Sequence, residues 1–242
     1  MAKNPDRFSA QLVGQGETRV KIQIYTMQSV EEAQAVIALG VDHIGITPGE
    51  YGLPGEVDFA IARDIVDAVG DSAVCVALSV DSDFDAICAM VKAVGPDILH
   101  LCGLENTLPP KEVRELRRRL PGLAIMQAIS VAGAEAVDVA AAYQDVADYL
   151  ILDTQAPDIA GIGASGVTHD WSISREIVRQ SRIPVILAGG LSPENVPEAA
   201  RVVQPWGVDS LTHTNQSLPG DGFRKDLDRV RQFVTSARGV LL

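Results

Sequence analysis

The sequence predicts an α/β fold in which eight strand–helix units close into a single (β/α)8 barrel. Short apolar runs alternate with amphipathic helical segments through the 242-residue chain. One unit follows another about every 25–35 residues, which is the repeat of a TIM barrel. The composition is 47% hydrophobic but only 5% aromatic, as expected of parallel strands that are buried on both faces. Glycine-rich turns lie late in the chain, whereas an open dinucleotide-binding sheet carries them after its first strand.

Each expected strand is a short apolar run, and capping residues, glycine and proline mark the turns between units. We expect strands at 19–25, 43–47, 73–79, 97–101, 123–129, 148–152, 184–188 and 207–212. We expect helices at 29–40 and near 58–69, 83–94, 109–120, 133–143, 172–181, 192–203 and 221–237. Ser29 and Glu32 form a capping box at the first helix, and Gly40 ends it. Pro110 and Pro193 open two later helices, because proline is favoured in a first turn.

The bulk properties limit the partners of this chain. A net charge of −12 argues against nucleic acid and anionic membranes, because both attract basic surfaces. Three cysteines without a CxxC pair make neither a disulfide framework nor a zinc motif, so we expect no metal and no other cofactor. No apolar run reaches about 18 residues and the start lacks the apolar core of a signal peptide. We therefore expect a cytoplasmic monomer or homodimer, with 1–18 as a polar extension and 19–242 as the barrel.

One turn predicts a binding site for phosphate. The apolar run that ends at Ala188 is followed by Gly189, Gly190 and Leu191, and Ser192 then caps the expected helix. Glycines let the backbone approach a ligand, and the N–H groups at a helix start attract anions. We therefore expect these residues to bind the phosphate of a small phosphorylated substrate.

The loop after the eighth strand is expected to complete this phosphate site. Thr212, His213 and Thr214 carry hydroxyl and imidazole donors that suit phosphate oxygens. In a TIM barrel, phosphate is often held by the loops after strands seven and eight. Asp209, in the eighth strand, is the acidic residue of this segment, and it is expected in the substrate site or as a structural group.

The order of motifs along the chain resembles the phosphoribosylanthranilate isomerase family. The motifs are Lys21-Ile22, 97–105, 149–154, 163–171, 187–191 with 193–196, 207–209, Pro219-Gly220 and Lys225-Asp226. The resemblance runs from about residue 19 to 235 and implies the TIM barrel independently of the strand pattern. It implies an aldose–ketose type isomerase, an intramolecular oxidoreductase, related to the enzyme that performs an Amadori rearrangement in tryptophan biosynthesis. It also places Asp153 at the family's general acid and Asp209 in the upper layer of the barrel interior.

Three departures from the family pattern concern its chemistry. The family's general-base cysteine corresponds to Gln23, and an amide does not titrate. The segment that carries the family's anthranilate-binding arginine is 48–56 here and contains Glu50 and Glu56 but no arginine. The family's histidine after strand four corresponds to Cys102. These departures predict a substrate other than phosphoribosylanthranilate.

A replacement base is then expected among Glu50, His100, Cys102 and His213. Strand alternation places Lys21, Gln23 and Tyr25 on the inner face of the first strand, and Gln127 is also expected to face inward. We predict acid–base catalysis by Asp153, with Gln23, His100 and Cys102 as the other candidate catalytic residues.

The main hypothesis is a phosphosugar-type isomerase or epimerase that works at the carboxyl-terminal face of the barrel. One alternative is a barrel that binds a phosphorylated ligand without converting it. Another is a true phosphoribosylanthranilate isomerase with an altered base. Less favoured hypotheses are a lyase that forms a Schiff base at Lys21 and a divalent metal site of histidine and carboxylate ligands.

Overall fold

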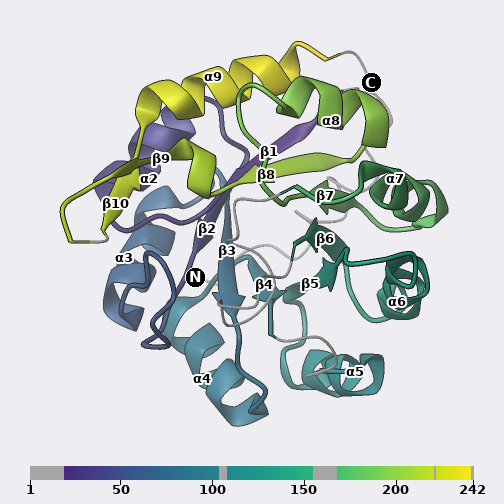
Figure 1. The fold of residues 1–242 in the computed structure, drawn as a ribbon. Coiled ribbons are helices and arrows are strands. Elements are labelled where there is room, and N and C mark those ends of the chain that lie inside the picture. The colour runs from purple at the N-terminus through teal and green to yellow at the C-terminus, as the bar shows by residue number, and fades with distance from the viewer. Residues whose placement is uncertain (1–18, 104–107, 155–167, 221, 241–242) are drawn as a thin grey trace.

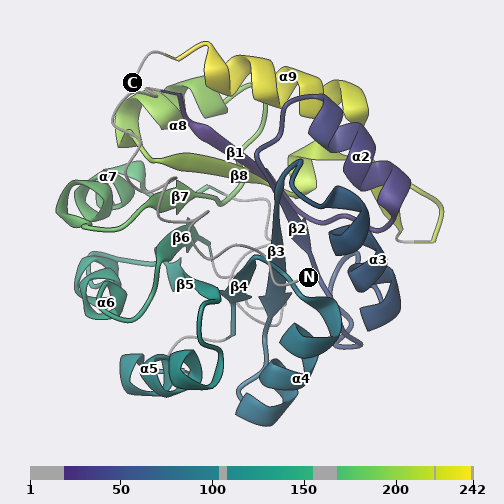
Figure 2. The ribbon, with the colours of Figure 1, turned by 180° about the vertical axis from the view of Figure 1, so that it is seen from behind.

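Eight parallel strands form a closed barrel in chain order, surrounded by helices. The computed structural model describes residues 19–103, 108–154, 168–220 and 222–240. Figure 1 looks along the barrel, with the strands as an inner ring and the helices as an outer one, and Figure 2 shows the same two rings from behind. The predicted (β/α)8 fold is therefore confirmed, whereas the expected extension at 1–18 lies outside the described residues.

The boundaries of the elements agree closely with the sequence patterns. The strands are β1 (Lys21–Ile24), β2 (His43–Ile46), β3 (Val74–Ser79), β4 (Ile98–Leu101), β5 (Ala124–Ser130), β6 (Tyr149–Asp153), β7 (Val185–Leu187) and β8 (Gly207–Ser210). The helices are α2 (Val30–Ala38), α3 (Phe59–Val69), α4 (Phe84–Val94), α5 (Pro110–Arg119), α6 (Ala136–Tyr143), α7 (Trp171–Gln180), α8 (Val196–Val203) and α9 (Leu227–Arg238). Ser29 caps α2 as predicted, because its side chain accepts a hydrogen bond from the Glu32 N–H. None of the helices described is long and apolar enough to cross a membrane.

The strands separate two apolar cores. Val76, Met126 and Ile186 belong to a cluster inside the barrel, whereas Ile22 and Ile24 belong to the cluster between strands and helices. Successive side chains of a strand point to opposite faces. Gln23 therefore lies on the inner face of β1, as the sequence predicts.

Gln127 does not face inward, contrary to the prediction. Its neighbours Met126 and Ala128 belong to the inner cluster, and Ile125 and Ile129 belong to the outer one. Gln127 thus points toward the helices, where its Nε2 donates a hydrogen bond to the Ala128 carbonyl. Apolar residues occupy both faces of β5, so its sequence does not show which face is the inner one.

The last two units depart from the expected helices. Helix α8 begins at Val196 rather than at Ser192, because the Asn195 side chain binds the backbone of the preceding turn at Ser192 N–H and Gly190 C=O. Side chains of this type compete with helical hydrogen bonds near helix starts. After β8, a 3-10 turn and the hairpin of β9 (Asn215–Ser217) and β10 (Phe223–Lys225) precede α9, which therefore starts later than predicted.

Strands β1 and β8 close the barrel. Gln23 pairs in register with Asp209, and Lys21 pairs with Gly207. Helix α9 lies against both α8 and α2 on the outside of this seam (Figure 1). The hairpin and the loop before α9 thereby come to lie beside the carboxyl end of β1.

Candidate active site

Two carboxyl groups share a pocket with the glycine turn. Asp153 ends β6 and Asp209 lies in β8, and both line a small pocket together with Gly189, Gly190 and Leu191. All of these residues are at or beyond the carboxyl ends of their strands, where barrel enzymes place their active sites. The strand ends and turns that carry these residues, up to 56 positions apart in the chain, are thus brought together at one rim of the barrel.

The surroundings raise the pKa of both carboxyl groups into the neutral range. Burial raises the pKa of Asp153 to about 7, although a hydrogen bond from the Thr154 N–H opposes this. Burial and the charge of Asp153 raise the pKa of Asp209 to about 8, whereas the Gln23 amide and the Lys225 ammonium group lower it. The two groups titrate as a pair, which loses its first proton near pH 7 and its second near pH 8. One carboxylic acid and one carboxylate can therefore coexist near neutral pH.

The glycine turn has a backbone that other residues rarely adopt. Gly189 has φ +81° and Gly190 has φ +63°, in the left-handed region that favours glycine. A Cβ on Gly189 would lie 2.8 Å from His169 Nδ1 and 2.9 Å from Thr154 Oγ1. Space as well as backbone conformation therefore requires glycine at position 189.

The strand-eight loop contributes two of its three predicted residues. Thr212 and His213 line the pocket with the glycine turn. Thr214 is fully buried and its hydroxyl donates to the Leu211 carbonyl, so it stabilises the 3-10 turn instead. This position was predicted to bind phosphate, but its side chain already has a structural partner.

Gln23 is buried beside Asp209. Its side chain is 1% exposed, and neither of its amide atoms has a hydrogen-bond partner of normal geometry. The amide still lies close enough to lower the pKa of Asp209. An uncompensated buried amide costs free energy, so this arrangement suits a site that a ligand fills.

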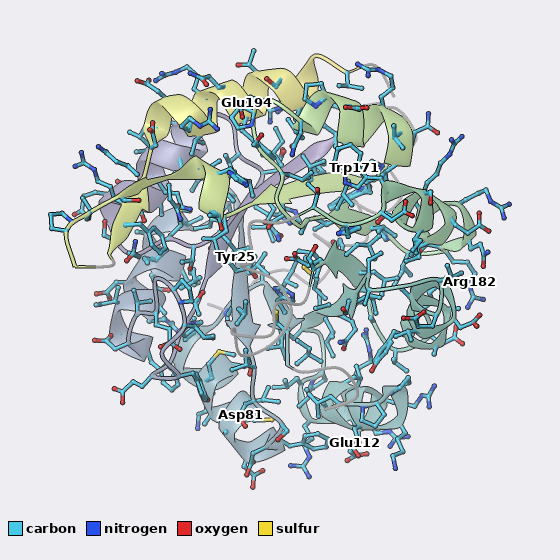
Figure 3. The ribbon with its side chains drawn as sticks, viewed as in Figure 1. Tyr25, Asp81, Glu112, Trp171, Arg182 and Glu194 are labelled. Atoms are coloured by element: carbon cyan, nitrogen blue, oxygen red, sulfur yellow. The ribbon has the colours of Figure 1, made fainter. Side chains whose placement is uncertain are left out.

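His100 and Cys102 lie inside the barrel but do not line this pocket. The Tyr25 hydroxyl and His100 Nδ1 are 2.9 Å apart, and Tyr25 lies inside the ring of strands in Figure 3, far from the outer Arg182. Burial lowers the pKa of His100 to about 3, so it is neutral. Cys102 is part of the inner apolar cluster. Both residues are thus packed in the core next to the site.

One of the two glutamates in the loop after β2 stabilises that loop through hydrogen bonds. Glu56 accepts hydrogen bonds from the N–H groups of Tyr51 and Gly52, and the Tyr51 hydroxyl donates to Asp81. Glu50 is exposed. Neither glutamate lines the pocket of Asp153 and Asp209.

Two residues near the site were not among the predicted ones. His169 contacts Thr154 Oγ1 at 3.2 Å and Ser174 Oγ at 2.7 Å, beside Gly189. Lys225 is 4% exposed, and its ammonium group donates to the Tyr25 carbonyl and to Asn215 Oδ1. Both lie in motifs of the family resemblance, but only the fold shows what they contact.

The described residues support neither the hypothesis of a metal site nor that of a Schiff base at Lys21. Across the described parts of the chain, no group of three or more His, Cys, Asp or Glu side chains is arranged to hold a metal ion. Lys21 begins β1 and lies near His43, and it does not line the pocket.

The chain is thus a (β/α)8 barrel with paired carboxyl groups beside a glycine turn, an arrangement suited to acid–base chemistry. The sequence model of N-(5'phosphoribosyl)anthranilate (PRA) isomerase matches residues 22–236. The N-(5'-phosphoribosyl)anthranilate isomerase of Methanocella arvoryzae is 34% identical over 221 residues, which are 91% of this chain and 98% of that protein. The chain therefore belongs to the PRA isomerase family, whose enzymes are intramolecular oxidoreductases of the aldose–ketose type.

Solved structures of PRA isomerases have the same fold. PRA isomerase from Thermotoga maritima has a TM-score of 0.76 at 26% identity, covering 91% of this chain and 100% of that one. A PRA isomerase in complex with reduced 1-(o-carboxyphenylamino)-1-deoxyribulose 5-phosphate has a TM-score of 0.74 at 24% identity, covering 91% and 100%. These comparisons do not show the different substrate that the departures at Gln23 and in the β2 loop predict.

Proposed function

We propose that this chain isomerises a phosphorylated aldosylamine to the 1-amino-1-deoxyketose, with PRA as the reference substrate. The observation that carries the proposal is the pairing of Asp153 with Asp209 in one pocket with the Gly189 turn. A sugar phosphate held at that turn has an acid and a base within reach. The names of the relatives support PRA as the first compound to test.

The reaction needs two groups that exchange protons with the substrate. Asp153, when protonated, donates to the ring oxygen as the C1–O bond breaks and an iminium forms. A base then removes the C2 proton to give an enolamine, and it returns that proton to C1. The carboxylate of Asp153 recovers a proton from the C2 hydroxyl as the ketone forms. Each group ends as it began, so no co-reactant is required.

The phosphate would be bound by backbone donors. By sequence, the segments that follow the eight strands contain only two Lys or Arg residues, Arg224 and Lys225. Lys225 already has two hydrogen-bond partners, and the Arg224 guanidinium donates to Gln216. N–H groups of the Gly190 turn are therefore the natural phosphate ligands, with the Thr212 hydroxyl beside them.

Substitution of Gly189 should weaken phosphate binding. In Gly189→Ala, the new methyl group meets His169 and Thr154 at under 3 Å, so the turn must shift. We expect the affinity for inorganic phosphate, measured by calorimetry, to fall about tenfold or more, since each 1.4 kcal/mol is a factor of ten. Gly122→Ala is the matched control, because Gly122 has φ +82° and nothing within 4 Å. An equal loss of affinity in both variants would contradict this phosphate site.

The carboxyl pair predicts a narrow pH optimum. Below about pH 7 both groups hold protons and the base is missing, and above about pH 8 both are ionised and the acid is missing. We therefore expect kcat/KM to rise as the pH approaches 7 and to fall above 8. A kcat/KM profile that stays flat from about pH 6 to about pH 9, a range that brackets both pKa values, would exclude these groups as the acid and base.

A second candidate is the same reaction on an aldosylamine without a carboxylate. An anthranilate carboxylate needs a cationic partner, but Arg224 and Lys225 are the only Lys or Arg residues of the strand-following segments and both are already hydrogen-bonded. Glu50 and Glu56 add negative charge to the β2 loop instead. A neutral amine substituent would avoid this repulsion.

The decisive assay compares two substrates that differ by one group. Purified protein is incubated with PRA and with the N-phosphoribosyl derivative of aniline, and the ketose product is quantified by chromatography. Conversion of PRA supports the reference substrate, and a preference of at least about tenfold for the aniline compound, or about 1.4 kcal/mol, supports the second candidate. If neither is converted although phosphate binds, the isomerase proposal is wrong and a ligand-binding barrel is the better description.

A further inference from the structure

The position of the family's general-base cysteine lies next to a carboxyl group in this chain. Gln23 stands where the family's general-base cysteine is expected, and it pairs in register with Asp209 on the adjacent strand. Both side chains belong to the inner face of the β1–β8 seam. A base on β8 at this level of the barrel would therefore approach a substrate from the side that the cysteine occupies in the family.

Asp209 is buried and incompletely partnered. It is 6% exposed, and its Oδ1 atom has no hydrogen-bond partner, yet it lines the pocket of Asp153 and the glycine turn. A buried carboxylate oxygen without a partner costs free energy, and most such atoms in folded proteins are satisfied. A carboxyl group that lines a pocket and keeps an unsatisfied acceptor atom is suited to take a proton from a ligand.

The other candidates for the base are less well placed. Glu50 is exposed outside the pocket, and Cys102 is packed in the inner apolar cluster. His100 is bonded to the Tyr25 hydroxyl. His213 lines the pocket from the 3-10 turn after β8 and does not belong to the inner face of the β1–β8 seam. Of the described candidates, Asp209 alone combines burial, an open oxygen and a place in the pocket.

We infer that Asp209 is the catalytic base, which removes the C2 proton and returns it to C1 in place of the family's thiolate. The inference rests on the proposed function. The carboxylate forms an O–H bond as the C2–H bond breaks, and the electron pair of that bond becomes the double bond of the enolamine. Protonation of C1 reverses the transfer, so Asp209 is ionised again at the end of the cycle.

Lys225 is the positioning residue for this base. Its ammonium group holds the Tyr25 carbonyl at the end of β1 and the Asn215 side chain in β9. Its backbone N–H donates to Glu32, which fixes it to the start of α2. From this place its positive charge stabilises ionised Asp209. Burial lowers the pKa of Lys225 to about 7, and the charges of Glu32 and Asp209 oppose that shift, so this stabilisation is strongest on the acidic side of the optimum.

The first test removes the base and then supplies another beside it. Asp209→Asn should lower kcat for the better substrate at least about 100-fold, the usual size of a general-base contribution. Adding Gln23→Cys to this variant should raise kcat at least about tenfold above that of Asp209→Asn, because a thiolate on the neighbouring strand can replace the carboxylate. Retention of more than half of the wild-type kcat in Asp209→Asn overturns the inference, and so does a double variant without recovery.

Two readouts separate this role from a structural one. Inorganic phosphate affinity should be unchanged in Asp209→Asn, since the turn at Gly189 is intact, and the melting temperature should not fall, since a buried ionisable group is replaced by a neutral one of the same shape. Lys225→Met should move the acidic limb of the kcat/KM profile upward by about one pH unit or less, because a stabilising charge is lost, and Lys225→Arg should move it back. An acidic limb that stays in place in Lys225→Met overturns the positioning role.

The failure of this inference is distinguishable from that of the proposed function. A wild-type protein that converts neither substrate overturns the proposed function and the inference with it. A wild-type protein that is active while Asp209→Asn is equally active overturns the inference alone.

Discussion

Asp153→Asn is expected to lower kcat about 1000-fold while the affinity for inorganic phosphate stays within twofold. The amide keeps the shape of the carboxyl group but cannot donate a proton to the ring oxygen and recover it later. Asp153 ends β6 in the pocket of the glycine turn, so no other described acid except Asp209 can take its place there. The measurement is a steady-state assay on the preferred substrate, with Asp83→Asn as the control. Asp83 is an exposed helix cap on α4, and asparagine caps equally well.

The same substitution should also change stability with pH in a defined direction. The pKa of Asp153 is raised to about 7 in the folded protein, so its stabilising protonated form is lost as the pH rises through 7. The wild-type protein should therefore lose up to a few kcal/mol of unfolding free energy between about pH 4, the unfolded pKa of an Asp, and pH 7. Asp153→Asn should show a smaller loss over that range in denaturant titrations. An inactive variant that is also unfolded at pH 5 would refute this explanation.

Gly45→Ala is expected to cost about 3 kcal/mol of stability, the upper part of the range for overpacked cores. Gly45 lies in β2, and a Cβ there would come within 2.1 to 2.3 Å of three atoms of the Tyr25 ring. That ring lies inside the barrel and its hydroxyl is hydrogen-bonded to His100, so the ring cannot move without breaking this hydrogen bond. Thermal unfolding should show a fall in melting temperature of about 6–12 °C for a chain of this size.

The control for this prediction isolates the contact between the two side chains. Gly222→Ala adds a methyl group whose nearest neighbour is Leu218 Cβ at 3.8 Å, so its effect should stay within about 0.5 kcal/mol. In Tyr25→Ala with Gly45→Ala, the clash is absent, and the double variant should cost less than the sum of the single ones by about 1 kcal/mol or more. Strict additivity would show that the ring does not fill the space beside Gly45.

Much of the barrel can be predicted from local patterns. Strand and helix positions follow from apolar runs and caps, and the inner face of β1 follows from alternation between Gln23 and its apolar neighbours. Alternation fails at Gln127, since apolar residues surround it on both faces of β5. It also misses the β9–β10 hairpin, whose segments are short and polar. Such a pair is stabilised by contacts with other elements, such as the hydrogen bond from the Lys225 N–H to Glu32 of α2, and not by its own sequence.

Only those site residues that lie at the end of a predictable strand can be predicted from the sequence. Asp153 and the Gly189 turn each follow an apolar run, so a barrel brings them to the same rim. The contact of Tyr25 with His100 spans 75 positions, and that of Lys225 with Tyr25 spans 200. Contacts of this kind depend on barrel closure and register, which no local pattern contains.

A crystal structure with reduced 1-(o-carboxyphenylamino)-1-deoxyribulose 5-phosphate, the compound bound in one solved relative, would test the central claim most directly. The account predicts phosphate oxygens about 3 Å from the N–H groups of the Gly190 turn, with C1 and C2 of the sugar between Asp153 and Asp209. A phosphate bound away from this turn, or a sugar with neither carboxyl group beside C1 and C2, would contradict it.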